Sequence, residues 1–430
     1  MRKILILYPH FPPSNLAGVH RPRLFAQHLH SLGWQPVVLT VHEQYYEEAL
    51  DPNLLKLLPA DLRVEKVGAL PISRPRLIGD IGLRAFFQLY RRAKQLIRRE
   101  KIDFLFISIP SFYCSLLVRW LHVSTGIAYG IDYIDPWVHR FPGSDRHLSR
   151  HWFSTRLARL LEPVAVKKAA LITGVAEAYY KPVLERNPRL KNTVLTGAMP
   201  YGGEARDFEI LETMHLQPYL FERKEGLVQL VYAGAMMPRS YGALESIFRA
   251  MAKEPDAYSK VEFHFIGTGS RANDAGSYNI KPLAEKYGLW QHPIFEYPKR
   301  IPYLDVLVHL QAAGGVFILG SSEPHYTPSK SYQAILSGRP ILAVLHEKSS
   351  AVPILEESGA AVVLPFDGES DLLKIENEFE PTLNRFMKMQ QNFDEQVVNH
   401  ALFEKYSAFE VTRQLALLLD KVVSSPVSQP

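Results

Sequence analysis

The sequence has a single cysteine, Cys114, among its 430 residues. One thiol cannot form an intrachain disulfide or supply a cysteine-rich zinc site. There is no run of eighteen apolar residues, so no membrane-spanning helix is predicted, and no Asn-x-Ser/Thr glycosylation acceptor occurs. The apolar stretch at residues 3–8 is too short for a signal peptide. These absences favour a globular protein of the cytoplasm.

Acidic residues are scarce in the first half of the chain. Residues 1–200 contain 28 Lys and Arg against 15 Asp and Glu, whereas residues 201–430 contain 21 against 29. A positively charged half attracts anionic partners, and nucleic acid, anionic lipid and phosphorylated acceptors all fit. Nucleic acid fits least, because the basic stretches lack interleaved aromatics and match no known binding module. We therefore expect no nucleic-acid partner.

Short apolar runs alternate with helical patterns along the whole chain. The runs are residues 3–8, 36–40, 104–108, 128–134, 170–175 and 192–197, then residues 227–234, 261–267, 293–297, 314–320, 340–344 and 360–364. Such alternation is typical of βαβ units and parallel sheets. We predict an α/β protein with two Rossmann-like, doubly wound parallel-sheet domains that face a cleft.

The domain boundaries follow from composition. Residues 201–226, rich in Gly, Pro and charge, are predicted to connect a first domain, residues 1–200, with a second, residues 227–400. One more helical pattern covers about 407–423, and residues 424–430 form a polar tail that we expect to be disordered. Ligands of open α/β sheets bind beyond the carboxyl ends of the strands, so chemistry is expected in the loops there.

The most informative segment is YTPSKSYQAILSGRPILAV, residues 326–344. Pro328 suits a first helical turn, and the pattern predicts a helix opened by Ser329 and Lys330. Gly338 is expected to end that helix. A helix amino terminus offers free N–H groups, and the charge of Lys330 adds to its attraction for a phosphate. An ordinary helix start with a solvated lysine is the alternative.

This segment resembles the donor-site signature of glycosyltransferases with two Rossmann-like domains, the GT-B architecture, and in particular family 4. Residues 328–330, Pro-Ser-Lys, and residues 337–340, Ser-Gly-Arg-Pro, match one variant of the signature. Its two glutamates fall on His325 and Gln333. The resemblance implies that Gln333 hydrogen-bonds the donor ribose without charge assistance. It also implies that His325, or Glu323 nearby, lies close to the donor sugar.

The resemblance covers nearly the whole chain, and it implies that the final helix, about residues 407–423, crosses back to complete the first domain. In the second half it implies that Gly234 admits the donor diphosphate and that Arg239 neutralises it, a surface arginine being the alternative for Arg239. The backbone near Tyr297 would face the nucleobase. The implied donor-binding residues are Gly18, Gly234, Gly267, Tyr297, His325, Tyr326, Thr327, Pro328, Ser329 and Gln333.

In the first half, the resemblance begins with the loop after the first predicted strand. Ala17-Gly18 stands in for a glycine pair that lets the backbone approach a ligand. His20 and Arg21 open the next helix and are implied to contact the acceptor. A solvated first-turn arginine is the alternative for Arg21.

Residues 131–140, IDYIDPWVHR, resemble the Arg/Tyr-Asp-x-Trp loop of the same architecture. A carboxylate at a strand's carboxyl end suits acceptor positioning or proton acceptance, and Asp135 is favoured there. Asp132 and His139 are further acceptor-binding candidates. The alternatives are a turn aspartate for Asp135 and a structural strand position for Asp132.

Two basic stretches, residues 83–101 and 146–169, show helical spacing of their apolar residues. Each is predicted to be an amphipathic helix with a basic outer face. A packed helix with a solvated charged face is the alternative for each. Together with the charge of the first half, they predict contact with an anionic membrane surface or a polyprenyl-diphosphate-linked acceptor.

The resemblance implies a retaining, metal-independent glycosyltransferase without cofactor, which moves a sugar from a UDP- or GDP-linked donor to a saccharide or lipid-linked acceptor. Its catalytic residues would be Asp135, Lys330 and Arg239, with the two cations stabilising the departing diphosphate. The setting would be cell-surface polysaccharide or glycolipid synthesis, in the cytoplasm or on the inner face of the plasma membrane.

Other functions stay open at this point. An epimerase or hydrolase of the same fold would need a set of acids and histidines in the cleft that the motifs do not supply. A catalytically silent GT-B subunit that binds or scaffolds a partner is favoured by His325 and Gln333 in place of acids. No Asp-x-Asp, HExxH, P-loop or Gly-x-Ser-x-Gly pattern occurs.

Overall fold

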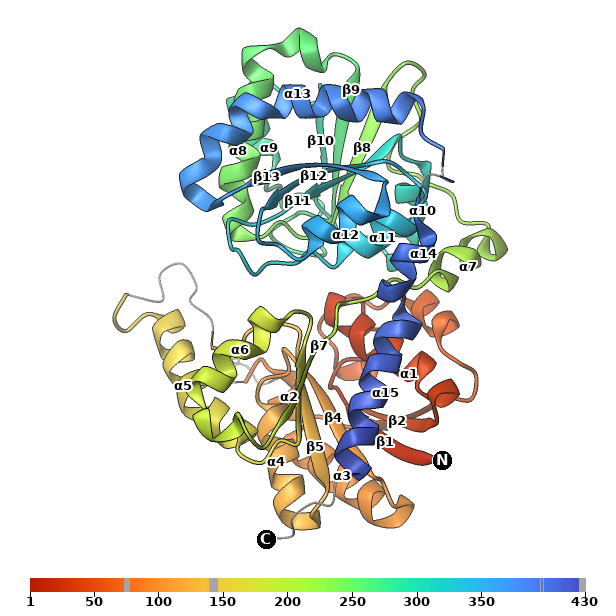
Figure 1. The fold of residues 1–430 in the computed structure, drawn as a ribbon, viewed down its shortest axis with the longest axis vertical. Coiled ribbons are helices and arrows are strands. Elements are labelled where there is room, and N and C mark those ends of the chain that lie inside the picture. Colours follow the sequence, from red (N-terminus) through yellow and green to blue (C-terminus); the bar gives the residue numbers. More distant parts are fainter. Residues whose placement is uncertain (73–77, 139–145, 395, 397, 425–430) are drawn as a thin grey trace. The chain divides into compact units, whose positions relative to one another are not determined.

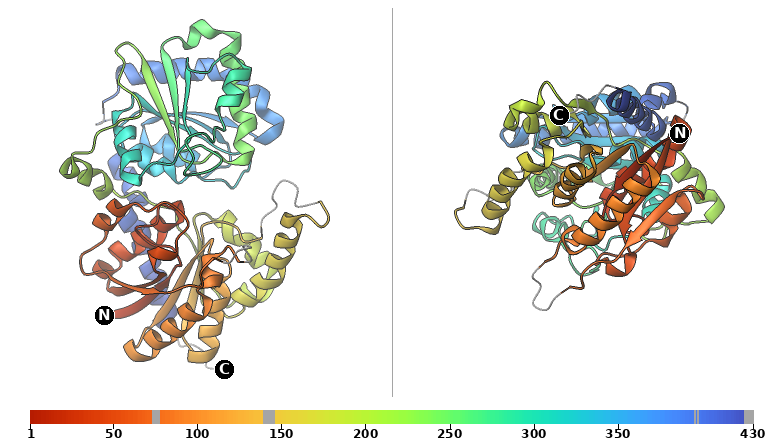
Figure 2. Two further views of the ribbon diagram at one scale, coloured as in Figure 1. Left: turned by 180° about the vertical axis from the view of Figure 1, so that it is seen from behind. Right: turned by 90° about the horizontal axis from the view of Figure 1, so that it is seen from below.

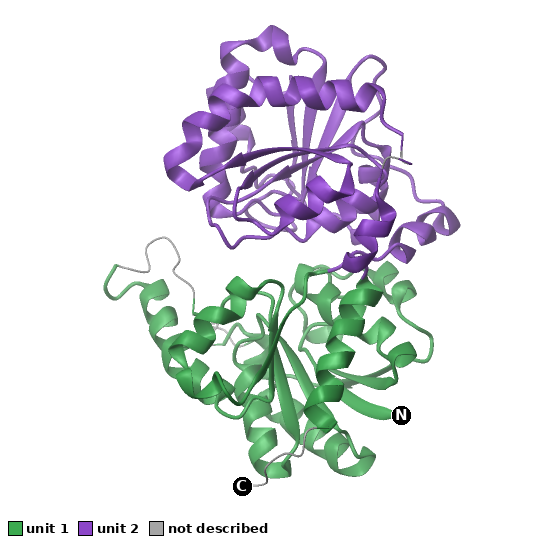
Figure 3. Ribbon diagram, in the orientation of Figure 1, with its two compact units in different colours: residues 1–201, 408–430 green, residues 202–407 purple. Residues whose placement is uncertain are grey.

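The computed structural model describes residues 1–72, 78–138, 146–394, 396 and 398–424. The chain divides into two compact units, shown in Figure 3: unit 1 is Met1–Tyr201 with Ala408–Pro430, and unit 2 is Gly202–Ser407. Within the described part of the chain, no helix is long and apolar enough to cross a bilayer. Each unit is built on its own parallel sheet.

Unit 1 contains a seven-stranded sheet in the order β3-β2-β1-β4-β5-β6-β7 (Figure 1). The strands are β1 (Arg2–Leu7), β2 (Trp34–Val41), β3 (Arg63–Val67), β4 (Phe104–Ile109), β5 (Ala128–Tyr133), β6 (Leu171–Gly174) and β7 (Leu195–Ala198). Every residue of β4 is buried, as expected for a parallel strand covered on both faces. The winding of the sheet reverses between β1 and β4, where open sheets of this kind bind ligands.

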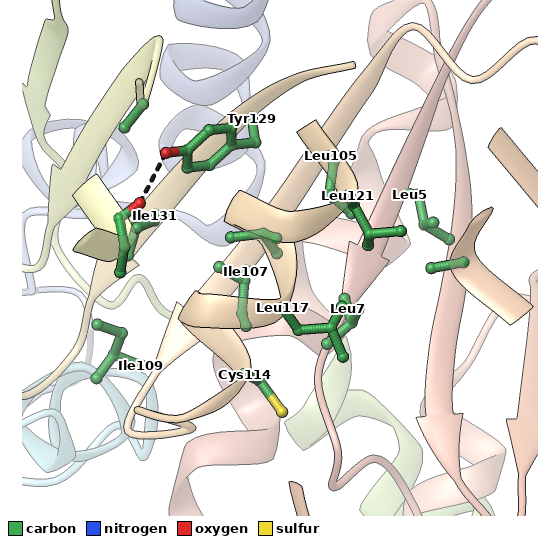
Figure 4. Close-up of a cluster of buried hydrophobic side chains, with 14 of the residues drawn as sticks. Leu5, Leu7, Leu105, Ile107, Ile109, Cys114, Leu117, Leu121, Tyr129 and Ile131 are labelled. Carbon is green, nitrogen blue, oxygen red and sulfur yellow. Dashed lines mark hydrogen bonds between the residues drawn. The ribbon is translucent and has the colours of Figure 1, made fainter. Parts of the chain in front are cut away.

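Helices cover both faces of this sheet (Figures 1 and 2). The unit-1 helices are α1 (His20–His28), α2 (Ile81–Arg84), α3 (Phe86–Glu100), α4 (Cys114–Thr125), α5 (Arg150–Val166), α6 (Glu177–Arg186) and α15 (Ala408–Ser424). Figure 4 shows part of the core between the sheet and α4, where Cys114 is buried. Burial raises the pKa of this thiol to about 12. On the other face, α1 and α15 pack against each other, so the last helix of the chain completes unit 1.

Unit 2 contains a six-stranded sheet in the order β10-β9-β8-β11-β12-β13. The strands are β8 (Val228–Ala233), β9 (Val261–Ile266), β10 (Ile294–Tyr297), β11 (Gly315–Leu319), β12 (Ile341–His346) and β13 (Ala361–Phe366). The helices are α7 (Arg206–Met214), α8 (Tyr241–Lys253), α9 (Lys281–Lys286), α10 (Tyr303–Ala312), α11 (Lys330–Leu336), α12 (Ala351–Ser358), α13 (Leu372–Gln391) and α14 (His400–Phe403). Here the winding reverses between β8 and β11.

The predicted fold class, two doubly wound parallel-sheet domains, is confirmed. The sequence analysis missed β3, whose five residues are all exposed or half-exposed, because a polar edge strand has no apolar run to mark it. Residues 202–226 belong to unit 2 and include α7. Ser424 ends α15, and the rest of the predicted disordered tail lies outside the described residues.

Candidate functional site

In unit 2 the loops after β8 and β11 meet where the sheet reverses. Lys330 opens α11 after the second loop, and its Nζ lies 3.7 Å from the centre of the Tyr232 ring, at the end of β8. This Nζ is buried and has no hydrogen-bond partner among the described residues. Burial lowers the pKa of Lys330 from 10.5 to about 7. An anion placed beside such an amine would stabilise its charged form, because the anion supplies both the missing hydrogen bonds and an opposite charge.

The backbone next to this amine is formed by two glycines. Gly234 follows β8 with φ +109°, and a Cβ built on it would lie 3.6 Å from the Lys330 Nζ. Gly267 follows β9 with φ +72°, and its Cβ would lie 3.9 Å from the Gly234 nitrogen. Both φ values are ones that residues with a Cβ rarely adopt. The pair therefore brings bare backbone up to the Lys330 amine, an arrangement suited to phosphate oxygens.

Tyr232 fixes the position of the amine. Its hydroxyl donates a hydrogen bond of 3.1 Å to the Ala235 carbonyl, and its side chain is almost fully buried. The ring face attracts the ammonium of Lys330 through its quadrupole. The sequence analysis missed this role, because an aromatic residue at a buried strand end is indistinguishable from an ordinary core residue.

Arg239 and Glu323 come together from the same two loops. The guanidinium of Arg239 lies 3.7 Å from a carboxylate oxygen of Glu323, and the Arg239 carbonyl accepts a 3.1 Å hydrogen bond from the Ser322 N–H. Arg239 is therefore at the predicted loop, with its charge partly balanced. Glu323, predicted as a substitute for the missing glutamate, is engaged with Arg239.

Six of the predicted donor residues, His325, Tyr326, Thr327, Pro328, Ser329 and Gln333, lie in the loop before α11 and on its first turn. The Oε1 atom of Gln333 is buried without a hydrogen-bond partner in the described part of the chain, and it can accept a hydrogen bond from a hydroxyl. Ser349 donates a 2.7 Å hydrogen bond to the Tyr326 carbonyl, and the Thr327 hydroxyl lies 2.6 Å from that of Ser350. The loop also holds His325, Pro328 and Ser329.

Tyr297, another predicted donor residue, ends β10. Its hydroxyl lies 3.2 Å from Nδ1 of His264, inside an aromatic cluster, and burial raises its pKa to about 12. Its carbonyl accepts a 2.8 Å hydrogen bond from the Gly267 N–H. The Tyr297 backbone thus supports the Gly267 turn, while its side chain is engaged with His264.

In unit 1, Arg21 and Asp132 form a fully buried ion pair. Nε of Arg21 lies 2.9 Å from Oδ2 of Asp132 and its second terminal nitrogen 3.1 Å from Oδ1, and both side chains are 0% exposed. Thr173 and Ser108 donate to the same carboxylate at 2.7 and 3.3 Å, and Arg21 also donates to the Pro200 carbonyl. Both residues were predicted to contact the acceptor. The structure encloses both side chains, so neither is exposed to a ligand.

The other predicted acceptor residues lie at the carboxyl edge of the same sheet. His20 begins α1, and burial together with the charge of Arg23 lowers its pKa well below the usual range, which keeps the imidazole neutral. Asp135 follows β5 and is exposed, and its charge contributes, after burial, to the raised pKa values of the Tyr8 and Tyr201 hydroxyls. His139 lies outside the described residues.

Gly18 lies close to Tyr8. A Cβ built on Gly18 would lie 2.4 Å from the Tyr8 hydroxyl oxygen and 3.8 Å from Cδ of Pro110. Next to it, the Tyr201 hydroxyl donates a 3.0 Å hydrogen bond to the Ala17 carbonyl. A side chain at position 18 therefore has to displace this loop or Tyr8.

Gly18→Ala is expected to destabilise the protein by about 1–3 kcal/mol, because the added methyl overlaps the Tyr8 hydroxyl. Denaturant unfolding measures the loss. Gly276→Ala is the control, since its Cβ would meet nothing closer than 3.4 Å. Tyr8→Phe removes the overlapping oxygen and should restore most of the stability of Gly18→Ala; a Gly18→Ala protein as stable as the wild type would contradict the close approach.

The sequence analysis missed a histidine–carboxylate pair after β1. Nδ1 of His10 lies 2.7 Å from Oε1 of Glu48, which also accepts a hydrogen bond from Ser14. Burial alone would raise the pKa of Glu48, but the hydrogen bonds and the charge of His10 lower it below the usual range. The pair lies at the carboxyl end of β1, beside the reversal point. Because Glu48 comes from the loop after β2, no local spacing connects it with His10.

Among the described residues, no group of three or more His, Cys, Asp or Glu side chains is placed to hold a metal ion. The chemistry visible in unit 2 is that of a cationic site for an anion, with an amide oxygen nearby. The chemistry visible in unit 1 is that of carboxylate, imidazole and phenol groups at one sheet edge. Such groups can position a hydroxyl and accept its proton.

No protein-family model matches the sequence, and no curated protein matches it. Solved structures do resemble it. They include HepE from Anabaena with UDP-glucose (TM-score 0.62, 13% identity, 98% of this chain and 100% of that chain) and sucrose-phosphate synthase from Thermosynechococcus elongatus (0.64, 13%, 99% and 100%). A Listeria monocytogenes protein assigned as a UDP-N-acetylglucosamine 2-epimerase is similar over 97% of this chain and 96% of its own, with TM-score 0.53 and 13% identity. These likenesses show that the chain has the GT-B fold.

Proposed function

We propose that the protein is a glycosyltransferase that takes its sugar from a nucleotide diphosphate sugar bound to unit 2. The observation that carries this proposal is the Lys330 amine, buried beside Gly234 and lacking a hydrogen-bond partner among the described residues. An anion at this amine would satisfy its hydrogen-bonding groups and its charge. UDP- and GDP-sugars are the proposed donors, and the UDP-glucose complex of HepE supports the first.

The proposed reaction breaks the bond between the anomeric carbon and the diphosphate, and forms a bond from that carbon to an acceptor oxygen. Lys330 would stabilise the negative charge of the departing diphosphate, with Arg239 as the weaker contributor because Glu323 balances part of its charge. Gln333 would accept a hydrogen bond from a ribose hydroxyl. We propose retention of configuration without a metal, which an NMR assignment of the product's anomeric proton, made in the presence of EDTA, tests directly.

Unit 1 is the proposed acceptor domain. The acceptor, a saccharide or a lipid-linked saccharide, would lose its hydroxyl proton to the departing phosphate or to Asp135, which is exposed after β5. Arg21 and Asp132 would act only by shaping the loops, since neither side chain is exposed. Cell-surface polysaccharide or glycolipid synthesis is the proposed setting.

A second candidate function is binding of the nucleotide sugar without transfer. It is favoured by His325 and Gln333, which stand where the resembling family has glutamates. This candidate predicts donor binding with no release of nucleotide diphosphate when acceptors are supplied. The transfer hypothesis predicts release.

The first test is thermal unfolding with a panel of UDP-, GDP-, ADP- and CMP-sugars. A donor present at a hundredfold excess over its Kd should stabilise the native state by about 2.7 kcal/mol. Lys330→Ala should lose this shift, whereas Lys260→Ala, an exposed lysine before the amino end of β9, should keep it. If no sugar nucleotide raises the unfolding temperature of the wild-type protein, the proposed donor site is wrong.

A further inference from the structure

Helix α5 exposes four large apolar side chains to solvent. Their exposed fractions are 54% for Phe153, 41% for Leu157, 69% for Leu160 and 47% for Val164. Since a helix turns by about 100° per residue, these positions fall within an arc of about 60°. We call them the apolar stripe. A soluble helix normally turns such a stripe toward the core, so its exposure calls for a partner.

The buried side of α5 lies opposite the apolar stripe. The buried residues of the helix are Ala158, Glu162, Ala165 and Val166. Their positions centre about 155° away from the stripe on the same helical projection. α5 packs on α4 through this buried side and lies at the outer side of unit 1 (Figure 1). The stripe therefore points away from the body of its own unit.

The charges around the stripe have one sign. Between residues 146 and 168, all of which are described, every exposed Lys, Arg, Asp or Glu is a cation: Arg146, Arg150, Arg156, Arg159, Lys167 and Lys168. The acid in this range, Glu162, is buried and lies 2.8 Å from Arg186. On the helical projection, Arg156 and the C-cap residue Lys167 border one side of the stripe, and Arg150 borders the other.

The second basic helix of unit 1 does not share this arrangement. In α3 the apolar residues Leu89, Ala93, Leu96 and Ile97 are buried. Arg92 of this helix is paired with Glu65 at 2.7 Å. α3 therefore packs these apolar residues against its own unit and leaves one large apolar side chain, Phe87, strongly exposed, whereas α5 exposes four.

We propose that the apolar stripe of α5 docks unit 1 on an anionic lipid bilayer. Apolar side chains would enter the boundary between headgroups and acyl chains, while the bordering Arg and Lys side chains reach the lipid phosphates. Two copies of the chain meeting through this stripe would bring cations against cations, so charge complementarity favours lipid over a second copy. The apolar stripe belongs to unit 1 and Lys330 to unit 2, so this proposal does not rest on the proposed donor chemistry.

Co-sedimentation with vesicles tests this proposal on the full chain. The wild-type protein should bind vesicles of phosphatidylcholine with phosphatidylglycerol at least tenfold more tightly than vesicles of phosphatidylcholine alone. Leu160→Glu should weaken binding to the anionic vesicles at least tenfold, because it places an acid within the stripe. Leu373→Glu is the matched control, since Leu373 is 68% exposed on α13 of unit 2, and it should bind like the wild type.

A second variant separates charge from apolar contact. Arg156→Gln/Lys167→Gln keeps the stripe and removes two of its bordering cations, and it should weaken anionic binding while leaving the unfolding temperature unchanged. Lys330→Ala should bind vesicles like the wild type, so loss of donor binding and loss of lipid binding are distinguishable.

Three outcomes would overturn the proposal. One is that wild-type protein fails to sediment with anionic vesicles. Another is that Leu160→Glu and Leu373→Glu bind equally well. The third is a concentration-dependent dimer in analytical ultracentrifugation that Leu160→Glu abolishes and anionic vesicles do not displace, which would make a second copy the occupant of the stripe.

Discussion

Lys330→Ala is expected to lower kcat for sugar transfer by roughly 100-fold or more, the usual effect of removing one group that stabilises charge in a transition state. The Lys330 Nζ is buried over the Tyr232 ring and is held 3.6 Å from the position that a Cβ of Gly234 would occupy. Apart from the chain neighbours of Gly234, the described atoms within 4 Å of that position all belong to Lys330. Steady-state release of nucleotide diphosphate measures the loss.

The pH dependence of donor binding distinguishes this role from a structural one. In the ligand-free protein burial lowers the pKa of Lys330 to about 7, and a bound diphosphate would raise it, because an adjacent anion favours the ammonium. Below pH 7 the amine is already charged, so affinity should be nearly constant. Above pH 7 binding has to take up a proton, so affinity should fall by up to about tenfold per pH unit.

Calorimetry at pH 8 in two buffers of different ionisation enthalpy measures that proton directly. The guanidinium of Lys330→Arg stays charged across this pH range, so donor binding by this variant should take up no proton. Lys330→Met should fold at least as stably as the wild type below pH 7, because folding no longer buries a charged amine. Binding by the wild-type protein without proton uptake would contradict the role assigned to the amine.

Arg21→Met is expected to destabilise the protein by about 3–5 kcal/mol, the usual cost of leaving one member of a buried ion pair without its partner. Both side chains of the Arg21–Asp132 pair are 0% exposed, so loss of Arg21 leaves the carboxylate of Asp132 without this cation and without access to solvent. The remaining donors to this carboxylate are the hydroxyls of Thr173 and Ser108. They cannot neutralise its charge. Denaturant unfolding measures the effect.

The control for this prediction is an exposed pair. Arg413 lies 2.6 Å from Glu410 with a side chain 49% exposed, and Arg413→Met should cost less than about 0.5 kcal/mol. Arg21→Met/Asp132→Leu removes both buried charges and should be more stable than Arg21→Met alone. Strictly additive losses from the two substitutions would show that the residues act independently, against the geometry described above.

Much of the fold could be predicted from local patterns. The apolar run of residues 104–108 lies within β4, all of whose residues are buried, because a strand covered on both faces needs an uninterrupted apolar sequence. The edge strand β3 could not be found in this way, since its exposed residues carry no such pattern. The helix predicted to open at Ser329 and Lys330 and to end at Gly338 is observed as α11. It ends just before Gly338, which adopts φ +66°, a left-handed conformation typical of the residue after a helix.

The part of the candidate site that depends on an unusual backbone conformation could be predicted from the sequence. Gly234 and Gly267 were identified as glycines in loops after strands, and both adopt positive φ. The burial of Arg21 could not be predicted, because nothing in its sequence context shows that Asp132, 111 positions away, lies within hydrogen-bond distance. The His10–Glu48 pair was missed for the same reason.

The sequence by itself determined the two parallel sheets, the glycine turns and the start of α11, since each depends on residues within one element or one loop. Only the tertiary structure decided which charged side chains remain available to a ligand and which apolar side chains remain exposed. It enclosed Arg21 with Asp132, left the Lys330 amine over Tyr232, and turned the apolar stripe of α5 outward. The physical reason is that charge neutralisation and burial depend on neighbours brought together by folding, and those neighbours are distant in the chain.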